Sequence, residues 1–146
     1  MFGLKGIKDK LTGASARMSG RTDALEAICA AAALISAADG DIEDAEVEAT
    51  TKAVSTNPTI SAAFSPAQIN QSIDKMLKRA ESGRAGRMGL YKEIEDIASD
   101  HDLAELVLLT ALDIADSDGE LEDAEQKVVE KIAQKLGLDA RKYLDV

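Results

Sequence analysis

One acidic segment occurs twice in this chain, and that repetition constrains the fold more than any other feature. The first copy spells Ala-Asp-Gly-Asp-Ile-Glu-Asp-Ala-Glu over residues 38–46, and the second spells Ser-Asp-Gly-Glu-Leu-Glu-Asp-Ala-Glu over residues 117–125. A shift of 79 residues (118 − 39) superimposes them. Each copy follows an apolar segment, turns at Asp-Gly and continues into an acidic helix start. We infer a duplicated helix–loop–helix unit, and we call residues 38–46 the first elbow and residues 117–125 the second elbow.

The composition favours helices throughout. The chain has 146 residues, long enough for one domain with a real core, and it contains only 2 Pro, no Trp and 3% aromatic residues. Alanine, leucine, glutamate and lysine are good helix formers. We therefore expect an all-α fold, a compact bundle of seven to eight helices built from two similar helix–loop–helix halves. A basic N-terminal segment at 1–20, either flexible or an amphipathic helix, precedes a single all-α domain at 21–146.

Capping signals and apolar spacing place the individual helices. Residues 103–114 form the most apolar stretch and are predicted to be the central buried helix. Residues 84–98 carry a helical apolar pattern, although the glycine-rich, basic stretch 83–89 is interpreted as an inter-helix loop. The remaining helices are expected over residues 22–38, 43–56, 58–65, 66–82, 122–136 and 139–144.

The net charge of −10 argues against nucleic-acid binding, which requires clustered cations. Cys29 is the only cysteine, so an intramolecular disulfide and a cysteine-based zinc site are excluded, and we expect it in the core. The only histidine, His101, is expected at a surface helix start. No apolar run reaches about 18 residues and no secretion signal is evident, so we expect a cytoplasmic protein. Its basic N-terminus could contact an anionic membrane surface peripherally.

Three interpretations of the elbows compete. In the first, the acids serve the fold alone: Glu43 and Glu122 are N-caps, and Glu46 and Glu125 complete capping boxes. In the second, the elbows are calcium-binding EF-hand loops. Placing Gly119 at the sixth loop position puts an isoleucine at the first position of each copy, where a carboxylate is required, so this alternative is weak.

In the third interpretation, the elbows meet and bind a divalent cation together. If the two halves pack with approximate two-fold symmetry, carboxylates from both copies would converge. Oxygen ligands without His or Cys favour Ca²⁺, Mg²⁺ or Mn²⁺ over Zn²⁺. The candidate metal ligands are Asp39, Glu46, Asp118 and Glu125, with Asp116 or Asp113 as additional donors.

The same residues carry a family resemblance. The patterns A-D-G-x-I-x-x-x-E at 38–46 and S-D-G-x-L-x-x-x-E at 117–125 resemble the TerB family of tellurite-resistance proteins. So do the basic start Met-Phe-Gly-Leu-Lys and the segment 132–139 near the end. The resemblance implies seven to eight helices in two similar halves. It also implies a role in bacterial stress resistance of the ter system, with membrane-associated ter proteins as partners.

By motif match, Asp39, Glu46, Asp118 and Glu125 inherit the metal-binding role proposed in that family. The copies are unequal, because Asp113 and Asp116 align with Leu34 and Ala37. We therefore expect the second elbow to bind a cation better than the first.

An enzyme is the weaker hypothesis. The chain has no G-x-S-x-G motif, no nucleophile–histidine pairing and no phosphate-binding glycine loop. With one histidine and one cysteine, it has almost no groups for redox chemistry on tellurite. We expect a non-enzymatic stress-response module located in the cytoplasm, with peripheral contact at the inner membrane. An EF-hand-like calcium sensor and a purely structural helical interaction domain remain the alternatives.

Overall fold

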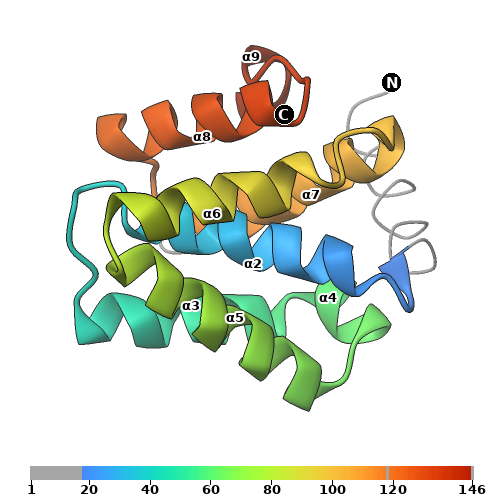
Figure 1. Cartoon of the computed structure of the whole chain (residues 1–146), viewed down its shortest axis with the longest axis horizontal. Helices are drawn as coiled ribbons and strands as arrows, with labels where there is room; N and C mark the ends of the chain where they lie inside the picture. The colour runs from blue at the N-terminus through green and yellow to red at the C-terminus, as the bar shows by residue number, and fades with distance from the viewer. Residues whose placement is uncertain (1–17, 118, 146) are drawn as a thin grey trace.

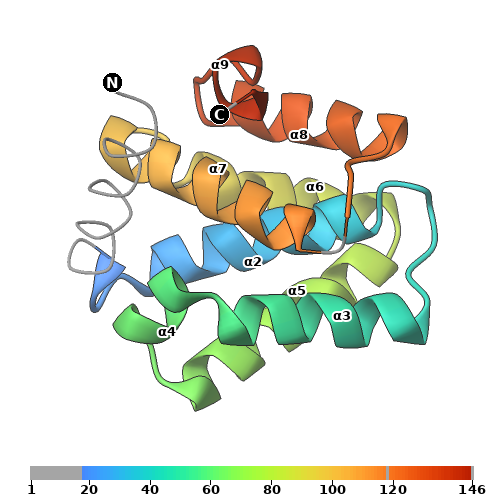
Figure 2. The same cartoon turned by 180° about the vertical axis from the view of Figure 1, so that it is seen from behind.

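The computed structural model describes residues 18–117 and 119–145, and within these ranges it contains eight helices and no strand (Figures 1 and 2). The prediction of an all-α bundle is confirmed. The predictions for residues 1–17 lie outside the described residues. The helices are α2 (Thr22–Ser36), α3 (Asp44–Thr56), α4 (Pro58–Ala63), α5 (Pro66–Glu81), α6 (Arg84–Glu95), α7 (His101–Asp116), α8 (Asp123–Lys135) and α9 (Arg141–Leu144).

The centre of the bundle is α2, which packs against α3, α5, α6, α7 and α8 (Figure 1). The prediction that residues 103–114 form the central helix is therefore wrong, since they belong to α7 on one side of α2. The physical reason is side-chain size. Six of the buried residues of α2 are alanines, which let helices approach closely from several directions, whereas α7 is rich in larger leucines.

The duplication predicted from the sequence is visible in the helix boundaries. The starts of α2 and α7 and the starts of α3 and α8 are separated by the same shift, because 101 − 22 and 123 − 44 both give 79. The second helix of each unit packs on the first helix of the other, α3 on α7 and α8 on α2. The two halves thus share one continuous hydrophobic core.

Local signals in the sequence account for the starts of three helices. The side chain of Asn57 accepts hydrogen bonds from the first amides of α4, and Ser65 and Gln68 form a reciprocal capping box at the start of α5. Asp100 caps α7 through the backbone N–H of Leu103, at 3.1 Å. These caps explain why the predicted starts of α4, α5 and α7 agree with the structure.

The stretch 83–89 differs from its interpretation as a loop. Gly83, with φ of +86°, precedes α6, and residues 84–89 are the first half of that helix. A Cβ on Gly86 would overlap the backbone carbonyl of Arg79 in α5, and one on Gly89 would meet the Arg79 guanidinium. These glycines allow α5 and α6 to pack closely and do not form a turn. Across the same contact, Arg79 of α5 forms an ion pair with Glu93 of α6 at 3.0 Å.

The C-terminal segment and the lone cysteine behave as the sequence indicated. Gly137, with φ of +75°, follows α8, and the hydroxyl of Tyr143 in α9 donates to Glu105 of α7 at 2.6 Å. Cys29 is fully buried in α2, and burial raises the pKa of its thiol to about 12.

Among the described residues, no helix has both the length and the apolar character needed to cross a membrane.

Candidate functional site: the pocket between the two elbows

The two acidic elbows, far apart in the sequence, line one small pocket. Its volume is about 140 Å³, and its walls come from the C-terminal end of α2, the first elbow and the start of α8. Of the predicted metal ligands, Asp39, Glu46 and Glu125 line it. Glu122 lines it too, although the sequence analysis assigned it only a capping role. Residues of both elbows therefore meet at one pocket, as the third interpretation requires.

The start of each acidic helix holds its glutamate in place. Glu43 and Glu122 are the N-cap residues of α3 and α8, with extended backbone angles. Glu125 accepts a hydrogen bond from the backbone N–H of Glu122 at 2.8 Å, and Glu46 accepts the equivalent bond from Glu43. Each carboxylate thus satisfies a backbone donor left free at a helix start, and its charge is favoured by the helix dipole.

The turn of the first elbow positions the carboxylate of Asp39. Asp39 accepts a hydrogen bond from the backbone N–H of Asp41 at 3.2 Å, and Gly40 between them has φ of +101°. Such an angle strains any residue with a side chain, which is why glycine stands here and at Gly119. Beside the pocket, the hydroxyls of Ser36 and Thr50 are hydrogen-bonded at 2.6 Å and tie α2 to α3.

The acids of the two elbows interact electrostatically. The pKa of Glu46 is raised, first by its partial removal from water and then by the charge of Asp39, with smaller contributions from Glu43 and Glu125. The hydrogen bond from the Glu43 backbone opposes this rise without cancelling it. Since Glu125 belongs to the second elbow, the repulsion crosses between the two copies, and a bound cation would relieve it.

The other predicted donors lie elsewhere. Asp116 and Asp113, near the end of α7, do not line the pocket, and the pKa of Asp113 is raised by loss of water contact and by the charge of Asp116. Asp118 lies outside the described residues. Ile35 and Ile114, which occupy the first EF-hand position in each copy, are buried within α2 and α7. Both are core residues, as their apolar character indicated.

The donor set matches a hard divalent cation in chemistry. The charged side chains that line the pocket are all carboxylates, and no basic side chain lines it. Its volume of about 140 Å³ exceeds the roughly 30 Å³ that one water molecule occupies, so an ion and water fit inside it. Within residues 18–117 and 119–145, however, no three His, Cys, Asp or Glu side chains are already gathered as a metal-ligand set. The carboxylates surround the pocket rather than converge on one point, which suits an ion that keeps part of its hydration shell, as Mg²⁺ does.

Comparison with known protein families identifies the family of this chain. The sequence model of the family described as "Tellurite resistance protein TerB" matches residues 25–145, a range that includes both elbows and every helix from α3 to α9. No curated protein and no solved structure matches the chain significantly.

Proposed function

This chain belongs to the TerB family of tellurite resistance proteins, and we propose that it is a non-enzymatic stress-response module that binds a divalent cation between its elbows. The observation that carries this proposal is the shared pocket, in which Asp39 and Glu46 face Glu122 and Glu125. Carboxylates that served only the turn and the helix starts would not need to share one pocket. Their arrangement costs electrostatic free energy, and a cation would recover it.

The ion that fits best is a hard cation bound through oxygen. Ca²⁺, Mg²⁺ and Mn²⁺ all accept carboxylate and water ligands, whereas Zn²⁺ prefers the nitrogen and sulfur donors that this pocket lacks. Asp118, which directly precedes Gly119 in the second elbow, would add a further oxygen. When bound, the ion would supply positive charge that links the two halves of the molecule.

The module acts through other proteins in this proposal. The resemblance to the TerB family suggests partners of the ter system, including membrane-associated ones, and the absence of a secretion signal in the sequence favours a cytoplasmic location. The basic segment at 1–20 would then provide peripheral contact with the inner membrane, since lysines and an anionic lipid surface attract each other.

Metal titration followed by NMR tests the site. Adding Ca²⁺ or Mg²⁺ to metal-free protein should shift the backbone amide signals of Gly40 and Gly119 together at millimolar concentration or below, and Mn²⁺ should broaden them. The Glu46→Gln/Glu125→Gln variant should lose at least about tenfold in cation affinity, because it removes two of the facing charges. Both substitutions preserve an oxygen that can accept the capping hydrogen bond.

Glu48→Gln is the matched control, since Glu48 is an exposed acid on α3 that does not line the pocket. The Glu48→Gln variant should bind the cation as tightly as the wild type does. If neither glycine amide moves at millimolar cation, the elbows are purely structural and the proposal fails. If only the Gly119 region responds, the second elbow binds alone, as in the EF-hand-like alternative.

The non-enzymatic assignment has its own test. Purified protein, incubated with tellurite and a thiol reductant, should reduce tellurite no faster than the reductant alone. A rate increase that grows with protein concentration would contradict the proposal and identify a reductase.

A further inference from the structure

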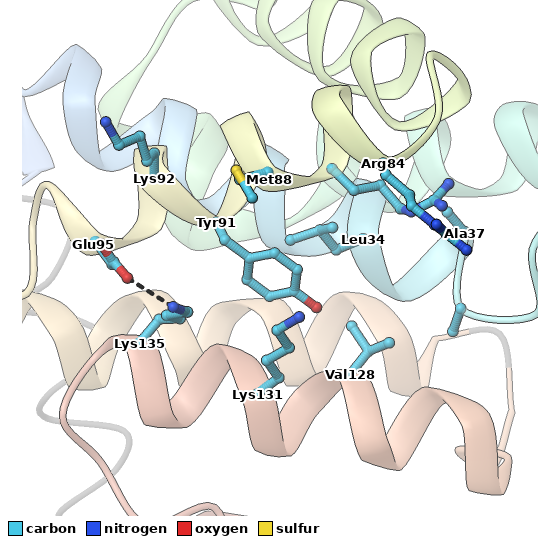
Figure 3. A pocket seen from close by; sticks show the side chains of 12 residues that line it. Leu34, Ala37, Arg84, Met88, Tyr91, Lys92, Glu95, Val128, Lys131 and Lys135 are labelled. Atoms are coloured by element: carbon cyan, nitrogen blue, oxygen red, sulfur yellow. Dashed lines mark ion pairs between the residues drawn. The ribbon is translucent and has the colours of Figure 1, made fainter.

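A second, larger cavity lies between α6 and α8, beside the C-terminal end of α2. It is a groove of about 580 Å³, and Figure 3 shows side chains of α6 and α8 facing each other across it. Its apolar floor consists of Leu34 of α2, Ala37 directly after α2 and Val128 of α8. Met88 stands at its edge with 71% of its surface exposed, and it is the one large apolar side chain exposed to this degree in the described part of the chain.

The rim of the groove carries the opposite charge to the molecule as a whole. Five cationic side chains line it and one carboxylate, Glu95, although the whole chain has a net charge of −10. The groove is therefore locally positive, although the protein as a whole is strongly negative. The cations are Arg84, Arg87, Lys92, Lys131 and Lys135.

Two of these cations are already engaged inside the groove. Lys135 pairs with Glu95 at 3.0 Å, and the ammonium of Lys131 lies 4.5 Å from the centre of the Tyr91 ring (Figure 3). For Arg84, Arg87 and Lys92, the structure shows no ion pair with any described residue. Three cations beside an apolar floor are thus available to a ligand that carries both acidic and apolar groups.

We propose that this groove binds an acidic segment of a partner protein, with carboxylates on the free cations and an apolar side chain against Met88 and Val128. The proposal deepens the proposed function, since it assumes that the chain acts through a partner, and it names the surface involved. It is independent of cation binding at the elbows. Acidic peptide segments with interspersed apolar residues match the groove in charge and in polarity.

The geometry disfavours other ligands. A bilayer surface cannot enter a concave groove, and a small inorganic anion would leave the apolar floor uncovered. A nucleic-acid base would need an open aromatic face, whereas Lys131 covers a face of Tyr91. The N-terminal segment 1–17 is itself basic, with three lysines and an arginine against one aspartate, so its charge does not complement the groove. A second copy, also at −10, would be repelled at long range.

Fluorescence anisotropy with a short dye-labelled peptide tests the proposal. The probe carries Glu and Leu at helical spacing, and two reference peptides replace either every Glu by Gln or every Leu by Ala. The metal-free protein should bind the probe, and each reference peptide should bind about tenfold more weakly or worse. Metal-free conditions separate this result from the cation test, because the groove should bind whether or not the elbows do.

Charge reversal at the rim locates the binding. Arg84→Glu/Lys92→Glu should weaken the probe at least about tenfold, and both residues are exposed, so the fold is expected to remain. Lys52→Glu/Lys142→Glu makes the same charge change on α3 and α9, away from the groove, and should weaken it less than about twofold. Met88→Ser tests the apolar contact and should bind the probe more weakly than the wild type does, with a smaller difference between the probe and its Leu→Ala reference, because Val128 still contributes apolar surface.

Several outcomes would overturn the proposal. The first is an absence of probe binding at low salt by wild-type protein whose circular dichroism shows a folded state. The second is equal weakening in the two charge-reversal variants. Binding of phosphatidylserine vesicles or single-stranded DNA in place of the peptide, lost in Arg84→Glu/Lys92→Glu, would assign the groove to a membrane or a nucleic acid. Concentration-dependent dimerisation in light scattering, lost in the same variant, would assign it to a second copy.

Discussion

At Glu46, two effects of one carboxylate oppose each other. Its hydrogen bond from the Glu43 backbone and its position in the first turn of α3 stabilise the helix. Its proximity to Asp39 and to the second elbow destabilises the charged form and raises its pKa. Because the pKa in the folded state lies above the ordinary value, the folded protein binds this proton more tightly than the unfolded chain does.

The sign of the resulting pH dependence follows. Protonation of Glu46 adds stability that is fully present below the ordinary pKa of 4.5 and is lost as the pH rises through the raised value. In metal-free buffer at neutral pH, Glu46→Gln should therefore be more stable than the wild type, by about 0.5 kcal/mol for such a partly exposed group. Urea unfolding at several pH values should show the difference shrinking toward pH 4.5.

Glu48→Gln serves again as the control and should not change this pH dependence. Saturating Ca²⁺ or Mg²⁺ should reverse the order, since the wild type would then gain binding free energy that Glu46→Gln lacks. A variant that matches the wild type at every pH would show that the acids of the elbows do not repel one another in solution.

At the scale of elements, the contact between α5 and α6 depends on two glycines in the first half of α6. A methyl group at Gly86 would overlap the Arg79 carbonyl, which belongs to rigid helical backbone, whereas one at Gly89 meets the movable end of the Arg79 side chain. Gly86→Ala should therefore push the two helices apart, and this overpacking should lower the free energy of unfolding by about 1–3 kcal/mol. The higher helix propensity of alanine offsets roughly 1 kcal/mol of that loss.

Gly89→Ala is the matched comparison, with the same gain in helix propensity and a softer contact. It should change the free energy of unfolding by less than about 1 kcal/mol. Urea denaturation of both variants measures the difference. Equal stabilities would mean that α6 shifts freely on α5.

The helices were largely predictable because their ends are coded locally. Asn57, Ser65 and Asp100 cap helices whose starts the sequence revealed, and the paired Asp-Gly turns revealed the duplication. The central position of α2 was not predictable in this way, because packing depends on the small size of its alanines and on which helices surround them. Helical periodicity predicts which face of a helix is apolar, but it does not predict how closely neighbouring helices pack against that face.

The candidate site was partly predictable for a similar reason. Repetition suggested that Asp39, Glu46 and Glu125 meet, but only the tertiary arrangement adds Glu122 to the pocket. The groove was missed entirely. Its arginines were assigned to a loop, and Lys131 and Lys135 lie 44 to 51 residues further along the chain (131 − 87 and 135 − 84), so no local pattern joins them.

At the scale of the whole molecule, the two halves depend on each other through α2, which packs against helices of both. A fragment ending at residue 100 lacks α7 and α8 and would expose the apolar faces of α2 that they cover. We expect this fragment to lose cooperative thermal unfolding in circular dichroism. A chain ending at Gly137 is the control, since no residue of α9 is fully buried, and it should unfold cooperatively.

The central place of a helix that comes early in the chain has a consequence during synthesis. When α2 leaves the ribosome, α7 and α8 have not yet been translated, although both must pack on it. The nascent chain therefore carries an alanine- and leucine-rich surface that stays uncovered until about residue 135 has emerged. The bundle can therefore be completed only after α8 has been translated, and until then α2 offers the kind of exposed apolar helix that chaperones bind.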